Sequence, residues 1–174
     1  MKQTFQEAVD SVLQSEGGFV NHPRDPGGMT CLGVTARTWE SWTGRPATEQ
    51  VMRSLTPRMV APLYRKNYWQ PAGCDLLPVG VDYCVFDFAV NSGPATAVKC
   101  LQHTVGVKPD GLVGPATLAG VDDCRERGFD TLVAELCADR VIFMQVLSGW
   151  QAFGAGWQRR VSEVHRRAVW MTKR

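Results

Sequence analysis

Signals that start and stop helices recur along this chain at intervals too short for long helices. Thr35 precedes one segment with helical periodicity and Gly44 follows it, while Thr56 and Pro57 open another. A threonine side chain accepts a hydrogen bond from the first helical turn, proline suits the first helical position, and glycine adopts the left-handed conformation that ends helices. This spacing predicts a fold of many short helices.

The predicted helices carry apolar residues at helical spacing on one face. In the first, Phe5 through Leu13 form a stripe that Gly17 and Gly18 terminate. We predict helices at about residues 4–16, 36–43, from 48, 57–69, 81–92, 94–105, from 115, 130–147 with Asp130 as its cap, and a last one carrying Trp157, Val161, Val164 and Ala168 on one face. Pro62 lies inside the helix at 57–69 and is expected to kink or split it.

Between the first two helices the pattern changes. Residues 19–35 contain short apolar pieces broken by Pro23, Pro26 and the Gly27–Gly28 pair, which predicts a loop and a small β-hairpin. We therefore expect a mainly α fold, with one hairpin after the first helix, in a single domain of residues 1–174. No long linker or repeat interrupts it.

The N-terminal segment contains Glu7, Asp10 and Glu16, where a signal peptide would have an uninterrupted apolar stretch. No apolar run approaches the ~20 residues of a membrane-spanning helix. We expect a protein that is made in the cytoplasm and is not exported by a cleaved signal.

The six cysteines are widely scattered and form none of the close pairs that zinc sites use. We expect reduced, mostly buried thiols, no metal site and no cofactor.

Glu16 is the first candidate for chemistry. It lies four residues beyond Val12 and seven beyond Val9, so it continues the apolar stripe of its helix. Burial and the negative end of the helix dipole both raise the pKa of a carboxyl group, and a carboxyl that stays protonated near neutral pH can act as a general acid. The structural alternative is a last-turn glutamate that bends into solvent.

Asp25 follows nine positions later in the proline- and glycine-rich loop, and Thr30 adds a hydroxyl group. Glycoside hydrolysis uses two carboxyl groups in contrasting environments, one that protonates the leaving oxygen and one that activates water or attacks the sugar. Thr30 would help to position that water, and Gly27 with Gly28 would let the backbone approach a sugar chain closely. Taken alone, the segment Asp25–Gly28 is also typical of an ordinary turn.

The run EGGFVNHPRDPGGMTCLGVT, residues 16–35, resembles the signature of glycoside hydrolase family 108, the EGG-motif muramidases. The resemblance continues through LYRKNYW, VDYCVFDFAVNSGP and DGLVGPATL, and so covers nearly the whole chain. It implies a lysozyme-like fold, with Glu16 as the catalytic acid and Asp25 and Thr30 as the second acid and the threonine of the phage-lysozyme arrangement. Residues 1–93 would form the catalytic part, and residues 94–174 a helical part that resembles a peptidoglycan-binding region.

Three further residues are weaker candidates for binding the sugar chain. Tyr64 and Tyr68 stand one helical turn apart and would line a glycan cleft, although such pairs are more often packing residues. Asn91 would hydrogen-bond an N-acetyl group or, alternatively, cap its helix. The turn in PDGLVGPAT needs no ligand to explain it.

The leading hypothesis is a muramidase that hydrolyses the β-1,4 bond between N-acetylmuramic acid and N-acetylglucosamine of peptidoglycan with inversion. The alternatives are a non-catalytic peptidoglycan-binding module, or a wall peptidase, for which the sequence shows no convincing nucleophile–base pair or metal ligands. The basic segment 157–174 has six Lys/Arg against one Glu, which suits a solvated face, an anionic polymer or an acidic lipid surface, and no recognition motif supports nucleic acid.

The family resemblance also implies a cellular context, since the group includes phage endolysins and secretion-associated lysozymes. Without a signal peptide, the enzyme would cross the inner membrane through a holin or holin-like route and act on the wall in the periplasm. We expect it to act as a monomer.

Overall fold

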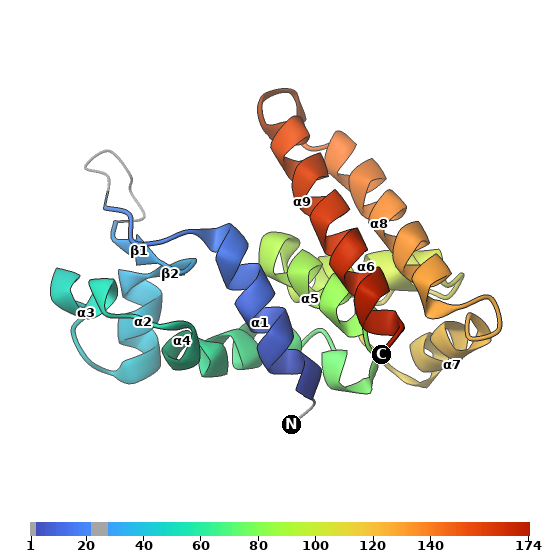
Figure 1. Ribbon diagram of the computed structural model, residues 1–174, viewed down its shortest axis with the longest axis horizontal. Helices are drawn as coiled ribbons and strands as arrows, with labels where there is room; N and C mark the ends of the chain where they lie inside the picture. Colours follow the sequence, from blue (N-terminus) through green and yellow to red (C-terminus); the bar gives the residue numbers. More distant parts are fainter. Residues whose placement is uncertain (1–2, 22–27) are drawn as a thin grey trace. The chain divides into compact units, whose positions relative to one another are not determined.

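The computed structural model describes residues 3–21 and 28–174, without the side chains of Gln3, Ser15 and Glu16. The chain divides into two compact units: the hairpin unit, Gln6–Lys66, and the helical unit, Met1–Phe5 with Asn67–Arg174. In the described part of the chain, helices dominate and the only sheet has two antiparallel strands (Figure 1). The predicted fold class, mainly α with one small hairpin after the first helix, is confirmed.

Helix α1 (Gln3–Glu16) has the predicted apolar stripe. The stripe is buried along its whole length, at Phe5, Ala8, Val9, Val12 and Leu13. In the helical unit, the Phe5 ring meets the rings of Trp69 and Phe86 edge to face, a favoured arrangement for aromatic pairs. Burial of this stripe, more than helix propensity, holds so short a helix in place.

The hairpin consists of β1 (Thr30–Cys31) and β2 (Val34–Thr35), in which Thr30 pairs with Thr35 and Cys31 with Val34. Leu32 and Gly33 form the two-residue turn, and both have positive φ, at 49° and 70°. Two consecutive positive φ values are typical of a type I′ hairpin turn, whose twist matches that of the strands.

Three short helices follow in the hairpin unit: α2 (Ala36–Thr43), α3 (Glu49–Arg53) and α4 (Pro57–Tyr64). Each begins with a threonine whose side chain accepts a hydrogen bond from a backbone N–H of the first turn, and these caps are Thr35, Thr48 and Thr56. Gly44 closes α2 with φ at 67°. The predicted starts of all three helices are confirmed, because caps of this kind depend only on neighbours in the sequence.

The predicted helix at 57–69 changes type partway. After α4, residues Arg65–Trp69 form a π-helical turn, η1. Pro62 lies inside α4, where it has no N–H to donate to the preceding turn. We predicted that Pro62 would kink or split this helix. The segment begins as an α-helix and ends as a π-helical turn, three residues after Pro62.

The helical unit is centred on α5 (Val81–Ser92), in which every residue from Val81 to Ala89 is buried. It packs against α6 (Pro94–Thr104), α8 (Phe129–Gln145), α9 (Trp150–Thr172) and the short 3₁₀ helix η2 (Cys74–Leu76). Helix α7 (Pro115–Asp123) follows the predicted turn, and α8 and α9 lie side by side as an antiparallel pair (Figure 1). The predicted central helix and the starts at Pro94 and Pro115 are confirmed.

The predicted cap of α8 is wrong. The helix begins at Phe129 after Gly128, whose φ of 88° few other residues adopt. Asp130 is instead the second helical residue, and its Oδ1 accepts a hydrogen bond from Thr131 N at 3.0 Å. A carboxylate in the first turn still suits the helix dipole, so an aspartate at this second position resembles a cap in the sequence.

A buried ionic cluster joins three helices of the helical unit, and the sequence reading did not anticipate it. Asp87 of α5 accepts a hydrogen bond from Arg140 of α8 at 2.7 Å and from Arg160 Nη2 of α9 at 3.0 Å. Arg140 and Asp87 are almost completely buried. In the sequence, Asp87 stands between Phe86 and Phe88, and Arg140 directly precedes the apolar run 141–144.

The predicted burial of the cysteines is confirmed, because five of the six are buried. All six are unpaired in the structure, and their reduced state in the cell stays a prediction. Cys84 of α5 and Cys137 of α8 are in contact, with their Sγ atoms 3.5 Å apart. Among the described helices, none has the length and apolar character required to cross a membrane.

Candidate functional site

Glu16 is the last residue of α1. The residues one and two turns before it on the same face, Val12 and Val9, are fully buried. Gly17 follows in the left-handed conformation with φ at 79°, the usual way to end a helix. The Glu16 side chain lies outside the described part of the structure, so its burial stays a prediction.

The chain beyond Gly17 and Gly18 is tied into the hairpin unit at two successive residues. The guanidinium carbon of Arg53 lies 4.0 Å from the centre of the Phe19 ring, a distance at which a cation is attracted to an aromatic face. Val20 and Thr30 exchange two backbone hydrogen bonds of 2.8 Å. The backbone on the C-terminal side of Glu16 is therefore fastened directly to the strand that carries Thr30.

Thr30 is half-buried, and its backbone pairs with Val20 on one side and Thr35 on the other. Asp25 belongs to residues 22–27, which lie outside the described residues. Val20 and Thr30 stand on either side of that segment in the chain. The structure thus connects Thr30 to the end of α1, while the position of Asp25 relative to both stays a prediction.

The described residues, apart from the chain neighbours, leave room around the glycines next to this site. At Gly17, Gly18 and Gly28, no described atom lies within 4 Å of the place that a Cβ would take. Gly17 and Gly28 are required for their positive φ, whereas the lack of a side chain at Gly18 is not forced by packing against the described residues. A backbone left uncovered in this way allows a bulky ligand to approach closely.

Tyr64 supports the hairpin from within the hairpin unit. Its side chain is 2 % exposed, and its hydroxyl donates a hydrogen bond of 2.9 Å to the carbonyl oxygen of Leu32 in the turn. This is the packing role that the sequence left open as the alternative to sugar binding. No signal in the sequence links Tyr64 to Leu32, because the two residues are far apart in the chain.

Tyr68 and Asn91 belong to the helical unit. Tyr68 is half-buried in η1, and Asn91 is exposed near the end of α5, where its Oδ1 accepts a hydrogen bond of 3.1 Å from the Ser92 hydroxyl. Asn91 is not the helix cap, because Gly93 takes that position with φ at 89° and donates its N–H to Ala89. Both side chains are accessible in their own unit, and their sugar-binding role stays a prediction.

A wall peptidase needs a metal centre or an activated nucleophile with its base. The described residues contain no group of three or more His, Cys, Asp or Glu able to hold a metal ion. Cys100 and His103 line one pocket of the helical unit together with Asp139. Burial, followed by the nearby Asp139 carboxylate, raises the pKa of the Cys100 thiol to about 12. A thiol with so high a pKa is a poor nucleophile at neutral pH, so this pocket does not favour cysteine-peptidase chemistry.

Comparison with known proteins gives two family matches that follow each other along the chain. The family model described as Glycosyl hydrolase 108 matches residues 9–93, and that described as Predicted Peptidoglycan domain matches residues 96–162. The first contains Glu16 and the whole hairpin unit beyond it, and the second contains all but the first two residues of α6, then α7, α8 and the first half of α9.

Among solved structures, the chain is similar to SagA of Brucella abortus. The two are 42% identical, the match covers 100% of this chain and 98% of SagA, and the TM-score is 0.83. A search of curated proteins gives no significant match.

These matches define the class as a glycoside hydrolase with a lysozyme-like, mainly α fold that cleaves peptidoglycan. The chain belongs to glycoside hydrolase family 108. The family predicted from the EGG motif is therefore confirmed.

Proposed function

We propose that this muramidase hydrolyses the β-1,4 bond between N-acetylmuramic acid and N-acetylglucosamine, with Glu16 as the general acid. The observation that carries the proposal is the position of Glu16, at the end of a helix whose neighbouring turns on the same face are buried, inside the segment matched to the hydrolase family. An apolar setting and a helix C-terminus both favour the protonated carboxyl that must donate to the leaving oxygen. Glu16 would give its proton to that oxygen as the sugar bond breaks.

Asp25 is proposed as the second carboxylate, which orients and deprotonates the attacking water, and Thr30 as a hydroxyl that helps to hold this water. The backbone pairing of Thr30 with Val20 supports this role, since it fastens Thr30 to the chain that leaves Glu16. Two carboxyl groups ~6.5–9.5 Å apart leave room for a water molecule and give inversion, whereas ~5–5.5 Å gives a covalent intermediate and retention. We propose inversion.

For binding of the glycan strand, Tyr68 and Asn91 are the better candidates, because both are accessible in their unit. Tyr64 is proposed to contribute indirectly, by holding the hairpin turn through Leu32. The match of residues 96–162 to a peptidoglycan domain favours a wall-binding contribution from this part, alongside catalysis in residues 9–93.

The test of the mechanism is digestion of purified peptidoglycan by the full chain and by Glu16→Gln, which keeps the shape of the side chain but cannot donate the proton. We expect the loss of turbidity and the formation of new reducing muramic acid ends to fall by at least ~10³-fold, because an essential proton donor is removed. Asp10→Asn is the matched control, since it makes the same carboxylate-to-amide change at an exposed position of α1.

A Glu16→Gln variant that digests peptidoglycan at the rate of Asp10→Asn would remove Glu16 from the mechanism. Mass spectrometry of the products separates the alternatives, because a peptidase releases peptides and a binding module releases nothing. The configuration of the first-formed reducing end, read by NMR, decides between inversion and retention.

The cellular context belongs to the same proposal. We propose that the enzyme is monomeric, reaches the periplasm through a holin or holin-like route, and there lyses or remodels the wall as an endolysin or a secretion-associated lysozyme. Expression with and without a holin gene tests the route: lysis should depend on the holin. Lysis that is equally fast without it would contradict this route.

A further inference from the structure

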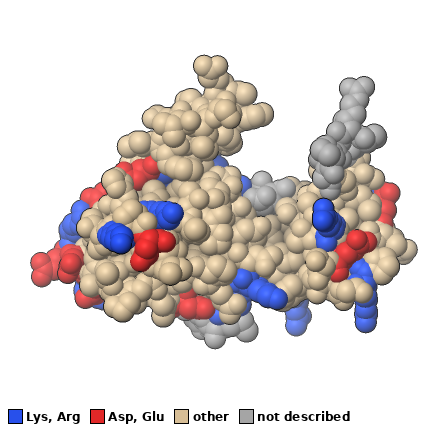
Figure 2. All heavy atoms as spheres, turned by 180° about the vertical axis from the view of Figure 1, so that it is seen from behind, with Lys and Arg blue, Asp and Glu red and all other residues tan. Residues whose placement is uncertain are grey.

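The turn between α8 and α9 carries no charged residue over a long stretch. From Val141 to Gln158 the sequence contains no Asp, Glu, Lys or Arg, although charged residues make up 21% of the chain. We call residues 145–158 the tip; they comprise the last residue of α8, the turn and the first turns of α9. Figure 2 shows this projection, the top of the α8–α9 pair in Figure 1, without a charged side chain on the visible face.

The tip exposes large apolar side chains. Val146 is 81% exposed and Phe153 62%, and Leu147 beside them is also exposed. Ile142, one turn before the tip on α8, is 61% exposed. Single exposed apolar residues are common on proteins, but a contiguous group of this kind marks a surface that meets another molecule or a membrane.

The aromatic side chains of the tip are packed in an ordered cluster. The Trp157 ring centre lies 6.2 Å from those of both Trp150 and Phe153. Gly154 makes this packing possible, because a Cβ there would lie only 2.8 Å from the Trp150 ring. The rings of the tip therefore pack against one another and against the backbone of α9.

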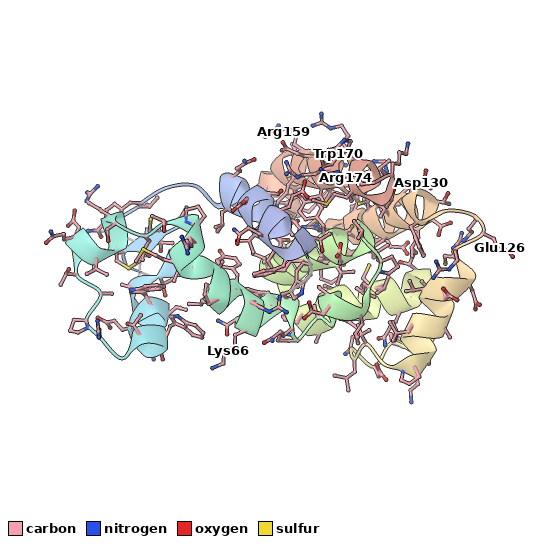
Figure 3. All side chains as sticks on the ribbon, turned by 60° about the horizontal axis from the view of Figure 1, so that its bottom comes forward. Lys66, Glu126, Asp130, Arg159, Trp170 and Arg174 are labelled. Carbon is pink, nitrogen blue, oxygen red and sulfur yellow. The ribbon has the colours of Figure 1, made fainter. Side chains whose placement is uncertain are left out.

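The helix that leaves the tip is basic. Arg159 is exposed directly below it, and the segment 157–174 has six Lys/Arg against Glu163 as the only acid. Figure 3 shows Arg159 together with Trp170 and Arg174 along α9, where the Arg174 guanidinium carbon lies 4.0 Å from the centre of the Trp170 ring. Arg160 is paired with the buried Asp87, and Arg174 lies beyond the opposite end of α9, so Arg159 is the exposed cation of this helix next to the uncharged tip.

We infer that the tip inserts into the interfacial region of a lipid bilayer, with the exposed Arg159 beside it at the level of anionic headgroups. Tryptophan prefers the membrane interface, exposed aliphatic side chains gain by entering the acyl boundary, and each Lys or Arg near an anionic surface adds to the attraction. The enzyme would then work on peptidoglycan while bound to a membrane. This property is separate from catalysis by Glu16.

Two other occupants fit the tip less well. The tip lies inside the segment matched to the peptidoglycan domain, but a glycan strand is bound through polar groups that match its hydroxyls, and Val146, Leu147 and Phe153 offer no donor or acceptor. We therefore assign the proposed wall-binding contribution to the polar remainder of residues 96–162 and not to the tip. A second copy of the chain would need a larger surface, since stable interfaces use ~20–30 residues from each partner and residues 145–158 form a narrow projection.

The test is flotation of the full-length protein with vesicles of phosphatidylglycerol and phosphatidylethanolamine, and with vesicles of phosphatidylcholine. The tip variant is Val146→Asp with Phe153→Asp. The matched control is Leu76→Asp with Leu112→Asp, which adds the same charge in the same unit at leucines that are 59% and 69% exposed. All four positions are open, so none of the changes places a charge in the core.

We expect wild type and control to float with the anionic vesicles and the tip variant to lose at least ~10-fold in partitioning, because two inserted apolar groups are replaced by carboxylates. Arg159→Gln should weaken binding to anionic vesicles several-fold and leave binding to neutral ones unchanged. All variants should digest lipid-free peptidoglycan within about twofold of wild type, so this result is independent of the mechanism proposed for Glu16.

Four results would overturn the inference. In the first two, the wild-type protein does not float, or the tip variant floats as well as the wild type does. In the third, the control variant loses flotation as much as the tip variant does. In the fourth, the tip variant fails to bind or digest lipid-free peptidoglycan. A fifth result would come from light scattering, which measures the oligomeric state. A wild-type dimer that dissociates on substitution of the tip would assign the tip to a second copy of the chain.

Discussion

Leu32 has an unfavourable backbone conformation, and a side chain from another element helps to hold it. It is the only non-glycine residue with positive φ in the described part of the chain, a conformation that costs such residues roughly 1–2 kcal/mol. The hydrogen bond from the buried Tyr64 hydroxyl to the Leu32 carbonyl helps to keep the turn in this conformation. Stability at the hairpin therefore depends on a side chain from α4.

We predict that Tyr64→Phe lowers the free energy of unfolding by about 1 kcal/mol, because it removes one buried hydrogen bond without opening a cavity. Urea denaturation measures the change. Activity on peptidoglycan should stay within about twofold of wild type in conditions where the variant is folded. A large rise in KM with no change in stability would instead assign Tyr64 to the substrate, as the sequence first led us to predict.

The Cys100 thiol gives a second prediction about a single residue. Its pKa of about 12 means that the thiol stays protonated near neutral pH, since burial and the Asp139 carboxylate both disfavour the thiolate. We expect iodoacetamide to label Cys100 at pH 8 at least ~10²-fold more slowly than a model thiol, and the rate to rise steadily between pH 8 and 10 as the thiolate fraction grows. Peptide mass spectrometry reads the label. Fast labelling that levels off below pH 9 would contradict the raised pKa.

Among the secondary-structure elements, the helices of the hairpin unit are specified by signals adjacent to them in the sequence. Thr35 shows this for α2: its Oγ1 accepts from Thr38 N at 3.1 Å, and Gly44 ends the helix two turns later. Signals of this type can be read before the fold is known, because cap and helix are contiguous. The α8 cap was mispredicted for the same reason, since an aspartate and a glycine two residues apart gave competing signals.

We predict that Thr35→Ala destabilises the protein by ~1 kcal/mol, because an N–H of the first turn of α2 loses its acceptor. Thr35→Ser keeps the acceptor and should recover most of this loss. Thermal or urea unfolding of the two variants measures the difference. Equal losses in both would mean that the threonine methyl group, and not the cap, provides the stability at this position.

In the molecule as a whole, the buried cluster of Asp87 with Arg140 and Arg160 links three helices that are distant in the sequence. Arg140 also lies over the Phe88 ring, with its guanidinium carbon 4.8 Å from the ring centre, while its Nε and Nη2 have no hydrogen-bond partner in the described structure. The single aspartate therefore compensates two cations, and one of these cations is incompletely satisfied.

We predict that Asp87→Asn destabilises the protein by about 3–5 kcal/mol, because it leaves buried arginine charge without a counter-ion. Arg140→Met should cost less, since Asp87 keeps Arg160 and the unsatisfied nitrogens of Arg140 are removed. Urea unfolding midpoints of both variants test this order. If Arg140→Met destabilises the protein as much as Asp87→Asn does, the two arginines do not substitute for each other.

The sequence by itself determined the class of fold, most helix starts, the hairpin, the buried stripe of α1 and the family, because each depends on residues close together in the chain or on a contiguous motif. Only the tertiary structure decided that Val20 pairs with Thr30, that Tyr64 holds the hairpin turn, and that Asp87 meets Arg140. Periodicity tells which face of an element is buried but not which distant side chain it will meet. That choice depends on how the elements pack, and it set the roles of the buried polar residues.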